Sequence, residues 1–210
     1  MKILRITLAC CFILGCYIFL DTKHALENFE FIKAFIKNPK EIGAILPSSD
    51  LLAEAMVESI DLKDGEYIVE IGAGTGAFSK KLLEKYPANK IFILEINSEL
   101  VKILKQKFQD AQIIEGDATK LQEILPAYVL SKVAAVVSGI PFRSLPEEIG
   151  QSIIKEACAV LAPNGKIIQF TYGLDSPIEA EKFNLLSFKY KQIHLNFPPA
   201  SVWIYMAKTE

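Results

Sequence analysis

The segment Tyr67-Ile-Val-Glu-Ile-Gly-Ala-Gly-Thr-Gly-Ala-Phe78 joins a short β-branched run to three glycines at alternating positions. Because β-branched residues favour strands, the run from Tyr67 to Ile71 predicts a buried strand. Gly72, Gly74 and Gly76 let the backbone turn tightly where a Cβ would block a ligand. A helix is expected directly afterwards, and its free N–H groups would face whatever binds on the turn. The segment therefore predicts a strand, a glycine turn and a helix around a ligand site.

The pattern after this segment keeps alternating between strands and helices. Strands are expected at 67–71, 90–95, 112–115, 134–138 and 166–171, and helices at 77–86, 98–108, 120–128 and 147–161. Repeated units of this kind imply a mainly parallel sheet with helices on both faces. Pro163-Asn164-Gly165 predicts a turn before the fifth strand. Beyond Gly173, a short helix at 178–183 and two runs, 187–195 and 202–207, predict an antiparallel hairpin on the sheet edge. The predicted fold is a Rossmann-like α/β fold with a seven-stranded sheet.

Composition limits the classes of protein to consider. With 210 residues, 51% of them hydrophobic and 23% charged, the chain fits one globular domain with a full core. A formal net charge of −2 provides no general field for a polyanion, so we expect no nucleic-acid partner. The cysteines lack the paired spacing of a metal site, and three of them fall in one apolar run. We therefore expect neither a metal nor a disulfide framework.

The N-terminus contains an uncharged run from Ile6 to Leu20, preceded by Lys2 and Arg5. Residues 1–20 are read as a membrane anchor or signal-like segment. Two alternatives are a lipoprotein cleavage box at Ile13–Cys16 and a misassigned start codon before an ordinary helix. Lysines are more numerous after the run than basic residues before it, which favours a cytoplasmic position for the rest of the chain.

Residues 21–210 are expected to form a single domain, with N-terminal helices in 21–60 and the Rossmann-like core in 65–210. Residues 26–37 have the spacing of an amphipathic helix, which would either join the core or lie on a membrane. A second helix is expected at 50–60, after a loop whose Ser48 or Ser49 could cap it.

The spacing of the glycines identifies a ligand class. Glu70-x-Gly-x-Gly-x-Gly76 differs from the G-x-G-x-x-G dinucleotide fingerprint and resembles motif I of class I S-adenosylmethionine-dependent methyltransferases. Two further acids, Glu95 and Asp117, close the next two strands, as this resemblance expects. It implies that Glu95 accepts from both ribose hydroxyls, that Asp117 accepts from the adenine amine and that the Ala118 N–H donates to a ring nitrogen. The implied cofactor-binding residues are Glu70, Gly72, Ala73, Gly74, Gly76, Glu95, Ile96, Asp117, Ala118 and Ser138.

The fourth strand leads into Val137-Ser-Gly-Ile-Pro-Phe-Arg-Ser-Leu-Pro146, where amino-group methyltransferases commonly carry Asn or Asp followed by Pro-Pro-aromatic. Ser138 replaces the amide here, which disfavours an adenine-N6 acceptor. Together with Asn38–Ser49 and Asn196–Trp203, this stretch resembles bacterial phospholipid N-methyltransferases, the soluble-type phosphatidylethanolamine-methylating enzymes. The resemblance extends from about Phe29 to Tyr205.

This resemblance implies a membrane lipid as substrate, a membrane surface as partner and a position at the cytoplasmic face of the inner membrane. Methyl transfer to an amine is an in-line displacement that depends on positioning and on exclusion of water. We expect the Ser138 oxygen and the Gly139 and Ile140 carbonyls to orient the amine.

Phe142 and Tyr172 could face the ammonium through cation–π contact, or could belong to the core. Arg143 would bind the lipid phosphate, or would be a solvated loop residue. Two further hypotheses remain open at this stage: an enzyme like the rRNA adenine-N6 dimethyltransferases, and a non-catalytic, membrane-tethered protein that binds the cofactor.

Overall fold

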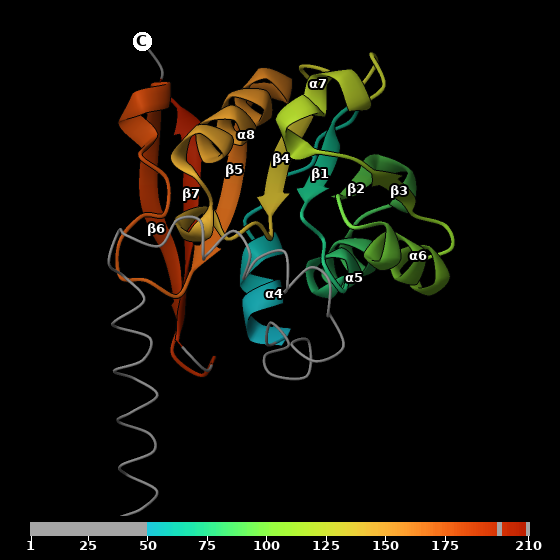
Figure 1. The fold of residues 1–210 in the computed structure, drawn as a ribbon, viewed down its shortest axis with the longest axis horizontal. Helices are drawn as coiled ribbons and strands as arrows, with labels where there is room; N and C mark the ends of the chain where they lie inside the picture. The colour runs from blue at the N-terminus through green and yellow to red at the C-terminus, as the bar shows by residue number, and fades with distance from the viewer. Residues whose placement is uncertain (1–49, 197–198, 209–210) are drawn as a thin grey trace, which may run out of the picture.

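The computed structural model describes residues 50–196 and 199–208. Its seven strands form one sheet in the order β3-β2-β1-β4-β5-β7-β6 (Figure 1). The strands are β1 (Tyr67–Ile71), β2 (Ile91–Glu95), β3 (Gln112–Glu115), β4 (Val133–Ser138), β5 (Leu161–Thr171), β6 (Leu185–Ile193) and β7 (Ala200–Ala207). The first five are parallel, and β7 is antiparallel to both of its neighbours. The predicted fold is thus confirmed, with the hairpin on the sheet edge.

Helices cover both faces of the sheet (Figure 1). They are α4 (Asp50–Val57), α5 (Ala77–Lys85), α6 (Ser98–Lys107), α7 (Leu121–Ile124) and α8 (Glu147–Val160). Alternation along β1 divides the core in two. Ile68 packs with residues of α4, α5 and α6, whereas Val69 and Ile71 pack with residues of α7 and α8. Glu70 therefore shares the α5 face of the sheet with Ile68.

Several predicted boundaries were wrong for identifiable reasons. The helix expected at 120–128 is only Leu121–Ile124 after a 3-10 turn at Ala118–Lys120, because Pro126 holds Leu125 extended at ψ 142°. The expected turn before the fifth strand lies inside β5. Leu161 already pairs with Val133 there, and the register shifts around Asn164, which has φ 67°.

Other elements differ in length. The helix expected at 50–60 ends at Val57, and the one expected at 178–183 is a 3-10 helix, Ala180–Phe183. The predictions for residues 1–49, including the anchor, the amphipathic helix and the serine cap, lie outside the described residues. Within the described ranges, no helix has the length and apolar character to cross a membrane.

Candidate cofactor and acceptor site

The predicted site residues meet where the strand order reverses, between β1 and β4. Crevices at the carboxyl ends of such strands are the usual ligand sites of open α/β sheets. The Gly139 N–H donates to the Ile71 carbonyl at 2.9 Å. A Cβ on Gly139 would lie 2.3 Å from the Gly72 carbonyl oxygen, so only glycine permits this approach. The glycine turn, residues 72–76, and the predicted acceptor loop, residues 138–146, are therefore in direct contact.

The turn itself is left-handed at Gly72, Gly74 and Gly76, with φ values of 68°, 58° and 87°. At Gly74 a Cβ would meet no protein atom within 4 Å, so this glycine borders open space. The turn thus presents bare backbone to open space at Gly74, as a cradle for an adenosine-type ligand requires.

Glu95, at the end of β2, is tied to this turn. Its Oε2 accepts from the Gly74 N–H at 2.8 Å, and its Oε1 accepts from the Asn97 N–H at 2.9 Å. A carboxylate oxygen has two lone pairs, so each oxygen can still accept from a ribose hydroxyl. Ile96 follows with 56% of its surface exposed, which leaves an apolar side chain beside the carboxylate. These features fit the cofactor implied by the sequence.

Asp117 follows β3 and caps the 3-10 turn Ala118–Lys120, because its Oδ1 accepts from the Thr119 N–H at 2.9 Å. The cap fixes the orientation of the carboxylate, and the next residue, Ala118, is buried. Asp117 therefore has a structural role that is compatible with the predicted contact to adenine.

Glu70 lies beneath the turn instead of lining it. The side chain is fully buried, and neither carboxylate oxygen has a hydrogen-bond partner within the described part of the chain. Burial raises the pKa of Glu70 to about 8, and the hydroxyl and N–H of Ser79 on α5 only moderate the rise. The Ser79 Oγ, like both Glu70 carboxylate oxygens, has no hydrogen-bond partner within the described residues, so Ser79 is a neighbour of Glu70 and does not satisfy it. An unsatisfied carboxyl behind the turn can be compensated by a cationic group of a ligand.

The acceptor loop is held by a residue that the sequence analysis missed. Gln169 on β5 is fully buried and pairs in register with Ser138 on β4. Its Nε2 donates to the Ile140 carbonyl at 3.0 Å and to the Phe170 carbonyl at 2.8 Å. The available signal was a polar residue inside an otherwise apolar strand, Ile167-Ile-Gln-Phe170.

These contacts limit what the loop carbonyls can do. The Ile140 carbonyl also accepts from the Phe142 N–H at 3.0 Å, so both of its lone pairs are used within the loop. Ser138 is fully buried, and its Oγ accepts from the Ile140 N–H at 3.2 Å. Of the predicted orienting groups, Ser138 Oγ therefore keeps a lone pair that could accept from an amine, whereas the Ile140 carbonyl does not.

Phe142 and Tyr172 have different surroundings. Phe142 is partly buried and packs against the apolar cluster on the α7 and α8 face. Tyr172 is 42% exposed at the end of β5. Its ring lies edge-on to Phe170, with centroids 5.4 Å apart, and Phe170 in turn meets Phe78 at 5.6 Å. Tyr172 therefore presents more ring surface to a ligand than Phe142 does.

Arg143 joins the acceptor loop to the segment after β5. It is exposed, and its Nη2 donates to the Asp175 carbonyl at 2.9 Å and to the Ser176 carbonyl at 3.4 Å. These contacts use one terminal nitrogen, so the guanidinium retains donors for an anion.

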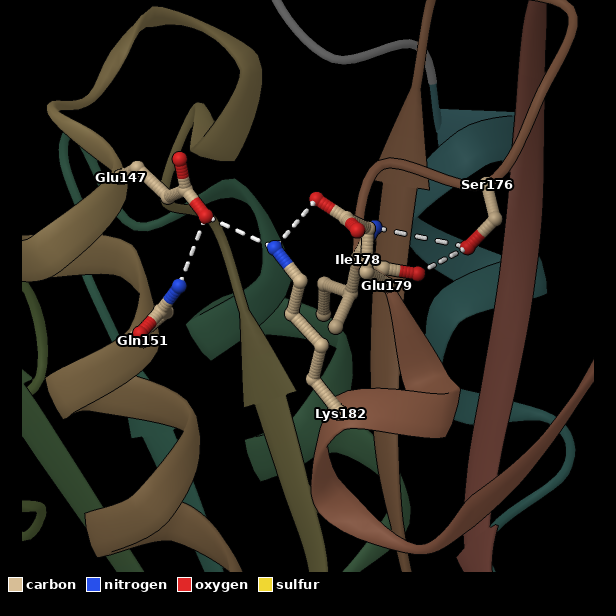
Figure 2. A network of polar contacts seen from close by, with 6 residues as sticks. All are labelled: Glu147, Gln151, Ser176, Ile178, Glu179 and Lys182. Carbon is tan, nitrogen blue, oxygen red and sulfur yellow. Dashed lines mark hydrogen bonds and ion pairs between the residues drawn. The ribbon is translucent and has the colours of Figure 1, made fainter.

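The segment 176–182, whose first residue is a partner of Arg143, is anchored by a polar network (Figure 2). The Ser176 Oγ donates to the Ile178 carbonyl at 2.6 Å. Lys182 binds Glu147 of α8 at 2.7 Å and Glu179 at 3.1 Å, which ties this segment to the first turn of α8. In the described ranges, no three His, Cys, Asp or Glu side chains are grouped as a metal site would require.

Comparison with known proteins identifies the family. The model of the family described as ribosomal RNA adenine dimethylase matches residues 25–168. An ornithine lipid N-methyltransferase from Singulisphaera acidiphila is 31% identical over 149 residues, which cover 69% of this chain and 78% of that protein. A ribosomal RNA small subunit methyltransferase A from Thermotoga neapolitana is 28% identical, and the match covers 62% of this chain but 48% of that protein.

Solved structures agree with the fold. A precorrin-6y C5,15-methyltransferase from Geobacter metallireducens superposes with a TM-score of 0.58 at 16% identity, covering 78% of this chain and 91% of that one. From the match to the family model and the match that covers 78% of the Singulisphaera enzyme, we conclude that the chain belongs to the ribosomal RNA adenine dimethylase family and is an S-adenosylmethionine-dependent methyltransferase.

Proposed function

We propose that this enzyme methylates the head-group amine of a membrane lipid, with phosphatidylethanolamine as the acceptor. The observation that carries the proposal is the acceptor loop, where buried Ser138 takes the place of an Asn or Asp side chain directly before Gly139, the residue that contacts the glycine turn. The Singulisphaera relative supports it, because its name specifies an N-methyltransferase for a lipid and the match extends over most of its length.

In this proposal the cofactor is held by the residues that end the first three strands. Glu95 accepts from the ribose hydroxyls, Asp117 and Ala118 bind the adenine edge, and Ile96 covers an adenine face. The glycine turn, including Ala73, lies against the remaining part of the cofactor. When bound, S-adenosylmethionine supplies an electrophilic methyl group.

The chain's own side chains prepare the acceptor. Its amine must lose a proton to solvent before transfer, because only the unshared electron pair can form the new N–C bond. Ser138 Oγ and the Gly139 carbonyl then accept from the remaining N–H groups and fix the nitrogen in line. The exposed ring of Tyr172 faces the methylated ammonium, and Phe142 supports the loop from the core side. Free donors of Arg143 bind the lipid phosphate.

We further propose that the domain works at the cytoplasmic face of the inner membrane. Support comes from the sequence alone: the uncharged run Ile6–Leu20 and the lysines that follow it.

A second candidate is N6-methylation of adenine in ribosomal RNA, which the match to the family model favours. The substituted acceptor loop and the net charge of −2 argue against it. The two candidates predict different labelled products from one experiment.

The test incubates the purified full chain with methyl-labelled S-adenosylmethionine and one acceptor at a time. The acceptors are phosphatidylethanolamine vesicles, vesicles that contain ornithine lipid, and ribosomal RNA. Gly74→Ala serves as the control, because its Cβ would fill the open side of the turn without meeting protein atoms, and the φ of 58° adds about 1–2 kcal/mol of local backbone strain. We expect label in phosphatidylethanolamine with the wild type and none with the control. Label only in RNA would overturn the proposal, and label in no acceptor would favour a non-catalytic, cofactor-binding protein.

A further inference from the structure

The two most exposed large apolar side chains of the described residues are Leu195 at 86% and Leu174 at 71%. Leu174 follows β5 and Leu195 follows β6. Since β5 and β6 are both antiparallel to β7, they run in the same direction. Their carboxyl ends therefore lie at the same edge of the sheet, namely the edge formed by the strand ends and not by an outer strand. That edge also carries the glycine turn and the acceptor loop. The two leucines are thus separated in sequence but share the edge that holds the site.

The loops that carry these leucines are fixed to each other and to the site. Lys189 of β6 donates to the Leu174 carbonyl at 3.0 Å, and the Tyr172 hydroxyl interacts with the side chain of buried Asn196. Arg143 of the acceptor loop donates to the carbonyl of Asp175, the residue after Leu174. Ordered loops that hold leucines in water lose the stabilisation that burial would give, so the leucines are expected to be covered by a partner.

The place where the described chain begins is at the same edge. The Lys81 Nζ of α5 lies 3.8 Å from the Glu54 Oε2 of α4, and the Lys85 Nζ donates to the Val57 carbonyl at 3.3 Å. Because the later residue of α5 contacts the later residue of α4, the two helices run side by side in one direction. The first turn of α4, with Leu51 51% exposed, is therefore level with the first turn of α5. The 49 preceding residues, which include the uncharged run Ile6–Leu20, join the domain here.

We propose that Leu51, Leu174 and Leu195, here called the apolar rim, insert into the interfacial region of a lipid bilayer. This inference rests on the proposed lipid acceptor, and it explains how that acceptor reaches the site. A head group has to leave the plane of the membrane only slightly if the edge holding Ser138 and Arg143 lies on that plane. The rim gives the orientation, whereas the N-terminal run would give only attachment.

The test uses the full chain and compares Leu174→Asp/Leu195→Asp with Leu186→Asp. Leu186 is a matched control, because it is on β6, is 53% exposed and lies near the opposite end of the strand. Each variant is assayed on vesicles of phosphatidylethanolamine and phosphatidylglycerol, and on short-chain phosphatidylethanolamine dissolved as monomers. We expect kcat/KM on vesicles to fall by about tenfold or more in the double variant, since two of the three rim leucines lose their apolar contact with lipid. Activity on the monomeric lipid should be unchanged, and Leu186→Asp should equal the wild type on both.

Other outcomes identify other occupants of the rim. Equal losses on vesicles and monomers, with a lower unfolding temperature, would mean that the rim covers the chain's own N-terminal residues. A dimer in the wild type that is lost in the double variant, with vesicle activity retained, would assign the rim to a second copy. Either result overturns the inference, as does a double variant with wild-type vesicle activity. A wild type that methylates neither lipid form would instead refute the proposed function.

Discussion

Replacing Glu70 by glutamine should change how the stability of this protein depends on pH. The Glu70 carboxyl is fully buried, and its pKa is raised from the ordinary 4.5 to about 8, chiefly by loss of hydration. The folded state therefore holds a proton that the unfolded state releases. Between pH 4.5 and about pH 8, the folded state binds more protons than the unfolded state. The contribution of Glu70 to stability is therefore greatest below pH 4.5, falls as the pH rises toward 8, and is constant at higher pH.

The size of the effect follows from the same two values. The difference between 4.5 and about 8 corresponds to about 5 kcal/mol over the whole window, at about 1.4 kcal/mol per pH unit. That is comparable to the whole stability of many domains of this size. Glu70→Gln keeps the shape of the side chain and removes the titration. Its buried amide lowers stability by a similar amount at every pH. The test therefore compares the slopes of the free energy of unfolding against pH, and not its absolute values.

The assay is urea unfolding of the full chain at several pH values between about 5 and 8, followed by far-ultraviolet circular dichroism. The free energy of unfolding of the wild type should decrease with pH more steeply than that of Glu70→Gln, by roughly 1 kcal/mol per unit. Glu115→Gln, at the exposed end of β3, is the matched control and should follow the wild type. Parallel curves for the wild type and Glu70→Gln would refute the reasoning, because they would mean that Glu70 ionises in the folded state without cost.

Three further substitutions test the site. Gly139→Ala would place a Cβ 2.3 Å from the Gly72 carbonyl oxygen, so the turn and loop must separate; we expect a loss of about 1–3 kcal/mol in urea unfolding, and an unchanged midpoint would contradict the close approach. Gln169→Leu removes the side-chain donor to the Ile140 and Phe170 carbonyls and leaves the Ile140 carbonyl with the Phe142 N–H alone, so it should cost about 1–3 kcal/mol, with kcat lowered more than the KM for lipid is raised; a change in KM alone would argue against a positioning role. Glu95→Gln turns an amide N–H toward a backbone donor, so calorimetry should show affinity for S-adenosylmethionine reduced by about tenfold or more, whereas equal affinity would exclude Glu95 from the cofactor site.

The parts of the fold that sequence predicted best are those decided locally. The β-branched run of β1 and the three glycines after it specify a strand and a left-handed turn without reference to the rest of the chain. The early end of α7 is also decided locally, because Pro126 keeps the residue before it out of the helical conformation. The first residues of β5 are different, because they become a strand only by pairing with Val133.

The candidate site shows the same division. That Glu95 would meet the glycine turn followed from the topology, since parallel strands bring their carboxyl ends together. Gln169 could not be placed in this way, because its function depends on the register between β4 and β5, which sets it opposite Ser138. The partners of Arg143 are backbone carbonyls 32 and 33 residues away, and no pattern of residue types indicates them.

Membership of a family named for ribosomal RNA is compatible with a lipid acceptor, because the two halves of the site are built differently. The proposed cofactor half consists of the glycine turn and of residues at the ends of β2 and β3, among them Glu95, which binds backbone N–H groups; none of these residues contacts the proposed acceptor, so this half suits any methyl acceptor. The proposed acceptor half consists of Ser138 at the end of β4 and of residues on the loops after β4 and β5, and such positions can change while the sheet stays the same. The family match ends at Ile168. Ser138 and Arg143 lie inside the matched range, whereas Tyr172, Leu174 and Leu195 lie beyond it. We therefore propose that the choice between lipid and RNA depends on the substitution at Ser138 inside the match and on the loops after β5 and β6 outside it.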